Sequence, residues 1–426
     1  MIPSGRGANP PHPRLVKYDL RMRHTCRTAL GLWLVVVAAV PARADDRIYH
    51  LPIGDAERRT REVPVVLDTV VASATGDRLS PEELATQLEP VRLLLIGETH
   101  TSMEAHRVQL QVLRALHRAG RRVIVGLEMY PYTKQDALDG WREGRWTEDE
   151  FLERADWHEQ WGYHWGYYRE IFVFVREARL PLLALNAPRE VVTAVRKTGL
   201  DELPADVRAH LPPSIDLHSD DHLTFFKASF DADDTVHGGM TDDAWRAMLS
   251  AQATWDAAMA WHALQAIEPA DDPRAIVVVL AGSGHVAYGV GIERQAHRWF
   301  DGPIASVIPV AVADEDGPTP TVRASYADFV WGIAREPAPM YPSLGVSTRA
   351  AEAGHREILA VEDDSPAAAA GLAVGDAIVA FQGESIDSRG ALSRAIAGCR
   401  WGDVVELTIA RDGAERTVRV PLRRSR

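Results

Sequence analysis

Four ionisable side chains lie directly after apolar runs that are far apart in the sequence. Glu98 and His100 follow LLLIG in the motif GETH, Glu128 follows VIVGL, and His285 follows VVVLAGSG. Carboxylates and imidazoles that lie close together can share a proton in general acid–base catalysis, or can bind a divalent metal ion that keeps one position open. The residue types predict one of these two chemistries, and the spacing Glu-x-His is not a metal motif by itself.

The apolar runs before these residues are typical of strands buried on both faces, because they are short and bounded by glycine. From residue 91 onward such runs alternate with segments of helical periodicity. This alternation indicates parallel strands joined by crossovers, so we predict a doubly wound, mainly parallel α/β sheet. The carboxyl ends of parallel strands open on a common crevice, where we expect the four side chains to meet.

Two stretches, 141–168 and about 201–267, interrupt this alternation and are helical in pattern and rich in Trp, His and Met. We predict that they form a helical insertion over the carboxyl edge of the sheet. Gln252, Asp256 and Met259 are spaced to share one helix face. An aromatic and Met-rich face is more often core, but an apolar slot also suits a porphyrin. Because an unpaired buried carboxylate is costly, Asp256 favours an open cavity.

The polar stretch DLHSDDH, residues 216–222, offers further carboxylates and imidazoles. Its composition is typical of a turn, so we interpret it mostly as a solvated loop.

Residues 343–426 form a small module of different composition after a Pro-rich segment. The motif SLGV, then SPAAAAGLAVGD and a β-rich C-terminal part, resemble a PDZ domain of the kind found in bacterial envelope proteases. The resemblance implies that a peptide C-terminus is added as a strand, with Leu344, Gly345 and Val346 as the carboxylate-binding loop. A packing domain without a ligand is the alternative.

The N-terminal segment has the features of a secretory signal. Arg21, Arg23 and Arg27 precede the apolar run 29–40, which is too short to span a bilayer, and small residues precede a cleavage site after Ala44. We therefore expect a periplasmic or secreted protein with no membrane anchor in the mature chain.

These boundaries predict three parts: an N-terminal extension with the signal peptide (1–44), an α/β domain with its helical subdomain (45–335) and the PDZ domain (343–426). The chain of 426 residues has a formal net charge of −13, and the Arg-rich leader makes the remainder more acidic still. An acidic protein of this kind disfavours non-specific binding to nucleic acids and to anionic membranes. We expect no nucleic-acid partner.

Several motifs together resemble the ChaN-type haem-binding family. They are GETH, GLEM, the segment WGYHWGYYREIFVFVREARLPLLALNAPRE, the helix AQATWDAAMA and AGSGHVAYGVGIERQ, and the likeness runs from about Leu93 to Trp299. It implies a parallel α/β sheet with a small helical domain and a role in iron or haem uptake or handling. It also implies haem held between two monomers, with a tyrosine on the iron and basic side chains on the propionates.

Tyr163, Tyr167, Tyr168 and Tyr288 are the tyrosine candidates that this resemblance singles out, and tyrosinate is a known haem ligand. Helix packing is the alternative role of Tyr168, and a strand-end position is that of Tyr288. Gln252, Asp256 and Met259 complete the candidate haem-binding set.

The wider group that includes ChaN-type proteins also contains erythromycin-esterase-like hydrolases and Tiki-type metal-dependent proteases. This membership implies an alternative function, a metal-dependent hydrolase or protease. Glu98, His100, Glu128 and His285 would then be its catalytic residues and its ligands for Zn or Mn. A PDZ module suits a protease that captures polypeptide termini. A third hypothesis makes the chain an adaptor with an inert α/β domain.

Overall fold

The computed structural model describes residues 46–230, 240–267, 272–312, 319–351 and 354–424. The segment 1–44, in which we predict a signal peptide cleaved after Ala44, lies outside the described residues. In the part of the chain that the structure describes, no helix combines the length and the apolar character needed to cross a bilayer.

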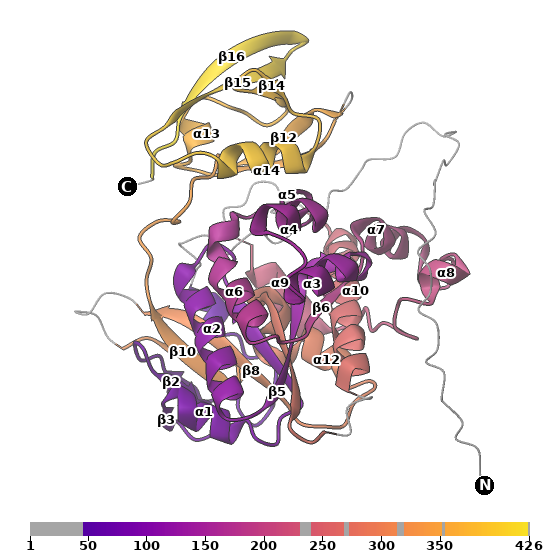
Figure 1. Cartoon of the computed structure of the whole chain (residues 1–426), viewed down its shortest axis with the longest axis vertical. Helices are drawn as coiled ribbons and strands as arrows, with labels where there is room; N and C mark the ends of the chain where they lie inside the picture. Colours follow the sequence, from indigo (N-terminus) through magenta and orange to yellow (C-terminus); the bar gives the residue numbers. More distant parts are fainter. Residues whose placement is uncertain (1–45, 231–239, 268–271, 313–318, 352–353, 425–426) are drawn as a thin grey trace. The chain divides into compact units, whose positions relative to one another are not determined.

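An eight-stranded sheet forms the centre of the larger domain, with the strand order β3-β2-β10-β8-β4-β7-β5-β6 (Figure 1). All pairs from β10 to β6 in this order are parallel, whereas β2 and β3 are antiparallel additions at one edge. A separate pair joins β1 (Glu62–Pro64) to β9 (Thr321–Arg323). The strands of the large sheet are β2 (Val70–Ala72), β3 (Arg78–Leu79), β4 (Leu93–Glu98), β5 (Arg122–Pro131), β6 (Leu182–Asn186), β7 (Ala275–Gly282), β8 (Ile304–Val312) and β10 (Phe329–Ala334).

The central strands are buried on both faces, as their apolar runs predict. Every residue of β4 and every residue of β7 is buried. Such strands are stable only when helices cover both sides of the sheet. The prediction of a mainly parallel α/β sheet is confirmed.

Two groups of helices cover the two faces of this sheet (Figure 1). Leu94 and Ile96 of β4 share one apolar core with Leu113 of α2 and Phe172 of α6. Helix α10 contacts β6 and β7 without contributing to that core, so it covers the opposite face. The helices of this domain are α1 (Pro81–Gln87), α2 (Met103–Arg118), α3 (Gln135–Arg142), α4 (Glu148–Arg154), α5 (Trp157–Gln160), α6 (Arg169–Glu177), α7 (Arg189–Thr198), α8 (Ala205–Arg208), α9 (Asp220–Ala228), α10 (Asp242–Ile267), α11 (Ser283–Val286) and α12 (Ile292–Ala296).

Both interrupting stretches are helical, as predicted, but their placement differs from the expectation in one respect. The first contains α4, α5 and the 3₁₀ helix η3 (Trp165–Tyr167), and the second contains α8, α9 and α10. Helix α10 lies on a face of the sheet rather than over its carboxyl edge. Its fully buried alanines, Ala253, Ala257 and Ala260, allow the helix to approach the sheet closely. The remaining 3₁₀ helices are η1 (Asp46–Tyr49), η2 (Tyr132–Lys134) and η4 (Ala287–Gly289).

The C-terminal domain has a six-stranded antiparallel sheet with its own apolar core, which includes Leu344, Ile358 and Leu407. The main order is β11-β12-β13-β15-β16, and β14 pairs with β13. Strand β11 therefore lies at a sheet edge, and it also contacts α14. The elements are β11 (Val346–Ala350), β12 (Arg356–Val361), α13 (Pro366–Ala369), β13 (Ala377–Phe381), β14 (Glu384–Ser385), α14 (Arg389–Ala397), β15 (Val404–Arg411) and β16 (Ala414–Pro421).

Candidate functional site

The four strand-end residues come together around Gly282, the last residue of β7. Glu98 is opposite Gly282 in the pairing of β4 with β7, and the Gly282 N–H donates to Glu128 Oε2 at 2.6 Å. A Cβ on Gly282 would lie 2.9 Å from His100 Cε1 and 3.6 Å from Glu128 Oε2. Glycine is thus required where the imidazole packs on the strand, and the four side chains meet, as predicted, in a buried cluster around the carboxyl end of β7.

Glu98 is the centre of the first of two hydrogen-bonded clusters. Its Oε1 accepts from His100 Nδ1 at 2.8 Å and from the Tyr168 hydroxyl at 2.6 Å, and its Oε2 accepts from Gln109 Nε2 at 2.7 Å. His106 Nε2 lies 3.4 Å from Oε2. Burial opposes the charged form, but His106 and His100 lower the pKa of Glu98 well below its ordinary value. Glu98 is therefore ionised at neutral pH.

His285 is the centre of the second cluster, between two carboxylates. Its Nδ1 lies 2.6 Å from Asp256 Oδ1, and its Nε2 lies 3.2 Å from Glu128 Oε1. Burial disfavours the imidazolium, but Glu128 and Asp256 outweigh this effect and raise the pKa of His285 to about 10. Burial likewise opposes the charge on Glu128, yet His285 and His100 lower its pKa. The cluster is a buried ion network with a protonated His285.

Helix α10 supplies this second cluster from one face, as its spacing predicts. The Gln252 amide nitrogen lies 3.0 Å from His285 Nδ1, and Asp256 contacts the same ring, while Met259 is fully buried in the core. Complete burial raises the pKa of Asp256, and His285 opposes this effect. We expected an open cavity beside Asp256 because an unpaired buried carboxylate is costly. In the structure this carboxylate is buried but paired, because it has an imidazolium partner.

Three polar residues of these clusters were not singled out from the sequence. His106 and Gln109 are three residues apart on α2 and so share the face that approaches Glu98. The spacing of these two residues, soon after GETH, is the sequence feature that could have identified them as partners of Glu98. The solvated-loop interpretation of DLHSDDH is wrong for His222, which lies in α9, is fully buried and has its Nε2 3.8 Å from Asp256 Oδ2.

Three of the candidate tyrosines are engaged inside the domain. Tyr168 is 0 % exposed, and burial together with Glu98 raises the pKa of its phenol well above the ordinary value. The Tyr288 hydroxyl donates to the Ile48 carbonyl at 2.7 Å, and burial raises its pKa. The Tyr167 hydroxyl accepts from the Tyr341 N–H at 3.2 Å, and burial raises its pKa to about 12. These contacts favour neutral, structural phenols.

Tyr163 differs from the other three because its side chain is only partly buried. Its ring centroid is 4.9 Å from that of His100 and 5.4 Å from that of Trp161. The segment after α5 thus places one partly buried tyrosine beside the imidazole of the first cluster. Among the four candidates, Tyr163 is the one that combines partial exposure with a ring contact to His100.

The described residues do not contain a group of three or more His, Cys, Asp and Glu side chains arranged to hold a metal ion. In the second cluster, both ring nitrogens of His285 face carboxylates, Asp256 at 2.6 Å and Glu128 at 3.2 Å. In the first cluster, Nδ1 of His100 is bonded to Glu98. The hypothesis of a Zn or Mn site is not supported.

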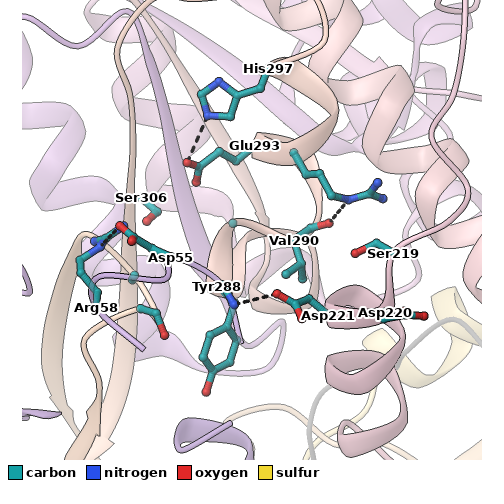
Figure 2. Close-up of a pocket in the computed structure, with 15 residues that line it drawn as sticks. Asp55, Arg58, Ser219, Asp220, Asp221, Tyr288, Val290, Glu293, His297 and Ser306 are labelled. Atoms are coloured by element: carbon teal, nitrogen blue, oxygen red, sulfur yellow. Dashed lines mark hydrogen bonds and ion pairs between the residues drawn. The ribbon is translucent and has the colours of Figure 1, made fainter. Parts of the chain in front are cut away.

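A cavity of about 500 Å³ lies apart from the four strand-end residues, beside Tyr288 (Figure 2). Its lining comes mainly from the segment 54–58, the start of α9 and the segment 288–297, and it is completed by Ser306, Ser325 and Ala327. Arg58 pairs there with Asp55 and Asp328, and Glu293 lies 3.5 Å from His297. Many of its polar groups have partners, several of them outside the lining, such as Asp216 for Arg294 and the Ile53 carbonyl for Ser325.

Comparison with known proteins agrees with this architecture. Residues 84–295 match the family model described as haem-binding uptake, Tiki superfamily, ChaN, and residues 342–422 match the PDZ domain model. The chain joins a ChaN-family domain to a PDZ domain. The resemblance drawn from GETH, GLEM and SLGV is therefore confirmed, and no curated protein sequence matches the chain.

Solved structures similar to the ChaN-family domain include ChaN of Campylobacter jejuni, described with cofacial haem binding. It is 17 % identical with a TM-score of 0.47, and the match covers 63 % of this chain and 98 % of that one. The HtrA-type protease AlgW with a decapeptide is 21 % identical over 20 % of this chain and 29 % of its own, with a TM-score of 0.19. A serine endoprotease from Yersinia pestis is 24 % identical over the same shares, with a TM-score of 0.18.

Proposed function

We propose that the ChaN-family domain of this chain binds haem and that Tyr163 supplies the ligand to the iron. The match of residues 84–295 to the haem-binding family carries the proposal. Bound haem supplies a ferric centre that favours an anionic oxygen ligand, and tyrosinate is an established ligand of this kind.

The residues around Tyr163 fit such a group. Tyr163 is a partly exposed residue, which places it to meet a ligand at the domain surface, whereas Tyr168, Tyr167 and Tyr288 are at most 4 % exposed. The adjacent Trp161 ring offers an apolar surface for a flat macrocycle. Arg189, which donates to the Gln160 carbonyl at 3.4 Å, supplies a cation near the same segment for a propionate.

We also propose that the mature protein handles haem outside the cytoplasm, in iron or haem uptake. The Arg-rich, then apolar, then small-residue pattern of residues 21–44 supports export. A homodimer that holds haem between two copies is the arrangement that the ChaN resemblance implies, and it belongs to the same proposal.

The PDZ domain is proposed to bind the C-terminus of a partner protein. Strand β11 lies at an edge of its sheet and contacts α14. A peptide can therefore be added to the sheet as a further strand beside β11. Gly345 in the preceding loop has φ of +72°, and a Cβ there would lie 2.2 Å from Ser365 Cβ. The loop therefore needs glycine to keep the fold expected for carboxylate binding.

Metal-dependent hydrolysis is the weaker candidate. Both clusters could exchange protons, but His285 is held between two carboxylates and the described residues lack a metal-binding group. The haem proposal has the support of the family match and of an accessible tyrosine.

Hemin titration of the purified mature chain, followed by absorbance, tests the haem proposal. We expect a saturable spectrum of the high-spin tyrosinate type with a defined stoichiometry. Binding that does not saturate, or that equals the background given by serum albumin, would contradict it.

A further inference from the structure

The segment that carries Tyr163 is held in part by residues outside the match to the haem-binding family. The ChaN family model ends at residue 295, and the PDZ domain model begins at residue 342. Residues of the PDZ domain and of the linker before it nevertheless contact the chain on both sides of Tyr163. The C-terminal domain can therefore act on the proposed iron ligand.

Helix α14 of the PDZ domain holds the turn before this tyrosine, because it contacts α5. Arg389, the first residue of α14, donates to the backbone carbonyls of Glu159 at 3.3 Å and Trp161 at 2.6 Å. Carbonyls at the end of a helix have no partner within that helix, so the guanidinium satisfies groups that would otherwise need water. In the opposite direction, the Gly390 N–H donates to Glu159 Oε2 at 2.5 Å.

Two glycines allow this close approach. A Cβ on Gly390 would lie 3.0 Å from Glu159 Oε2 and 3.1 Å from the Glu159 backbone nitrogen. Gly162 has φ of +86°, and a Cβ there would lie 2.8 Å from a terminal nitrogen of Arg389. The start of α14 thus lies directly against the turn that leads into Tyr163.

The residues after the proposed iron ligand are held by Tyr341, which lies in the linker. Its ring stacks on that of His164, with 3.6 Å between the centroids and 13° between the planes. Its backbone N–H donates to the Tyr167 hydroxyl at 3.2 Å. The linker is in turn fixed by Trp401 of the PDZ domain, whose Nε1 donates to the Met340 carbonyl at 3.1 Å.

Helix α14 also forms one wall of the expected peptide groove, since it contacts the edge strand β11. A strand added to a sheet lies about 4.8 Å from its neighbour. A peptide that pairs with β11 on the side of α14 therefore has to separate the helix from the strand. The helix that must move is the one whose first residue binds the carbonyls at the end of α5.

We infer, on the basis of the proposed haem binding, that the PDZ domain regulates the haem site. A peptide C-terminus in the groove draws α14 away from α5 and so loosens the segment that carries Tyr163. Arg389 is a positioning residue in this device, because it acts through the turn before Tyr163. Linkage makes the effect reciprocal, so the peptide lowers the affinity for hemin by the factor by which hemin lowers the affinity for the peptide. A partner protein recognised by its C-terminus would thereby promote the release of haem.

The first test follows amide hydrogen exchange in the haem-free full chain. The N–H groups of Trp161 and Gly162 donate to the Trp157 carbonyl at 2.9 and 3.2 Å, so their exchange reports on the turn. We expect faster exchange in Arg389→Gln, and in wild type after addition of a synthetic peptide that ends in an apolar residue with a free carboxylate. Arg394→Gln, which changes an exposed arginine of the same helix, should exchange as wild type does. Identical exchange in all these samples would overturn the inference.

The second test measures hemin affinity with and without a saturating amount of this peptide. Coupling between two sites usually amounts to about 5- to 150-fold, so we expect wild type to lose about 5-fold or more with the free-carboxylate peptide and nothing with its amidated form. Arg389→Gln should bind hemin more weakly than wild type without peptide, and the peptide should then have little further effect.

Gly390→Ala replaces Arg389→Gln if that variant does not fold, because the added Cβ crowds Glu159. Gly398→Ala, in which the added Cβ would meet only the Ala395 carbonyl at 3.5 Å, is its control and should respond to the peptide as wild type does.

The outcomes distinguish regulation by the PDZ domain from haem binding itself. If wild type fails to bind hemin saturably, the proposed function is wrong, and hydrogen exchange still decides whether α14 holds the turn. If wild type binds hemin and the peptide without any effect of one on the other, haem binding stands and the regulation is wrong. Hemin binding that is strengthened by the peptide, or a wild-type chain that binds hemin but no peptide, would also overturn the inference.

Discussion

The Nδ1 atom of His285 lies 2.6 Å from Oδ1 of Asp256, a carboxylate that is 0 % exposed on the central turn of α10. This contact joins the long helix of the insertion to the carboxyl end of β7. Breaking a buried ion pair by neutralising one partner leaves an uncompensated charge, which costs about 3–5 kcal/mol. The pair therefore has consequences for both the charge of His285 and the stability of the domain.

The first prediction concerns that pair. Asp256→Asn should lower the pKa of His285 and reduce the free energy of unfolding by about 3 kcal/mol or more, because the imidazolium loses one of its two carboxylates. NMR of the His285 ring and urea denaturation measure the two effects. The more exposed pair of His297 with Glu293, whose side chains are 53 % and 23 % exposed, provides the matched control, and Glu293→Gln should change stability by much less. Equal losses in both variants would contradict the prediction.

The second prediction is the pH dependence that follows from the same histidine. Its folded-state pKa of about 10 lies above the ordinary value of 6.5, so folding favours the protonated form. This contribution to stability is complete below about pH 6.5 and is lost as the pH rises toward 10. The slope should disappear in His285→Gln. A wild-type His285 that titrates below pH 8 would show that the two carboxylates do not hold it as a cation.

The third prediction separates Tyr168 from the haem ligand. Tyr168→Phe removes the 2.6 Å hydrogen bond to Glu98, so we expect a loss of about 1–3 kcal/mol in the free energy of unfolding. The hemin spectrum should keep its tyrosinate character. Loss of that character in Tyr168→Phe, with the domain still folded, would transfer the ligand role to Tyr168.

How much of this site could be predicted from sequence differs between its parts. Strand-end positions predicted that Glu98, His100, Glu128 and His285 would meet, because parallel strands fix where their carboxyl ends lie. The pairing of Asp256 with His285 could not be predicted, since it depends on how α10 lies across the sheet. Likewise, the spacing of the tyrosines says nothing about their exposure, which distinguishes Tyr163 from Tyr168. His222 was missed because a polar composition does not reveal the helix that buries it.

The fourth prediction concerns the carboxylate-binding loop of the PDZ domain. Gly345→Ala in the full chain should abolish micromolar binding of a C-terminal apolar peptide, because the added Cβ meets Ser365. Gly371→Ala is the matched control, since Gly371 has a similar φ of +74° but nothing within 4 Å of an added Cβ. Fluorescence anisotropy measures both. Equal binding of an amidated peptide by wild type would contradict carboxylate recognition.

The fifth prediction addresses the metal hypothesis. Elemental analysis of the protein as purified should find no stoichiometric Zn or Mn, and His100→Ala should leave the metal content unchanged. One ion per chain that is lost in His100→Ala would instead support the hydrolase alternative.

The ligand role of Tyr163 is tested most directly by the hemin spectrum of Tyr163→Phe beside that of Tyr167→Phe, a variant of a nearby tyrosine that is 4 % exposed. Resonance Raman spectroscopy of the ferric complexes reports the tyrosinate ligand itself. We expect tyrosinate modes in wild type and in Tyr167→Phe, and we expect Tyr163→Phe to lose them and to bind hemin more weakly. Unchanged tyrosinate modes in Tyr163→Phe would show that Tyr163 is not the iron ligand.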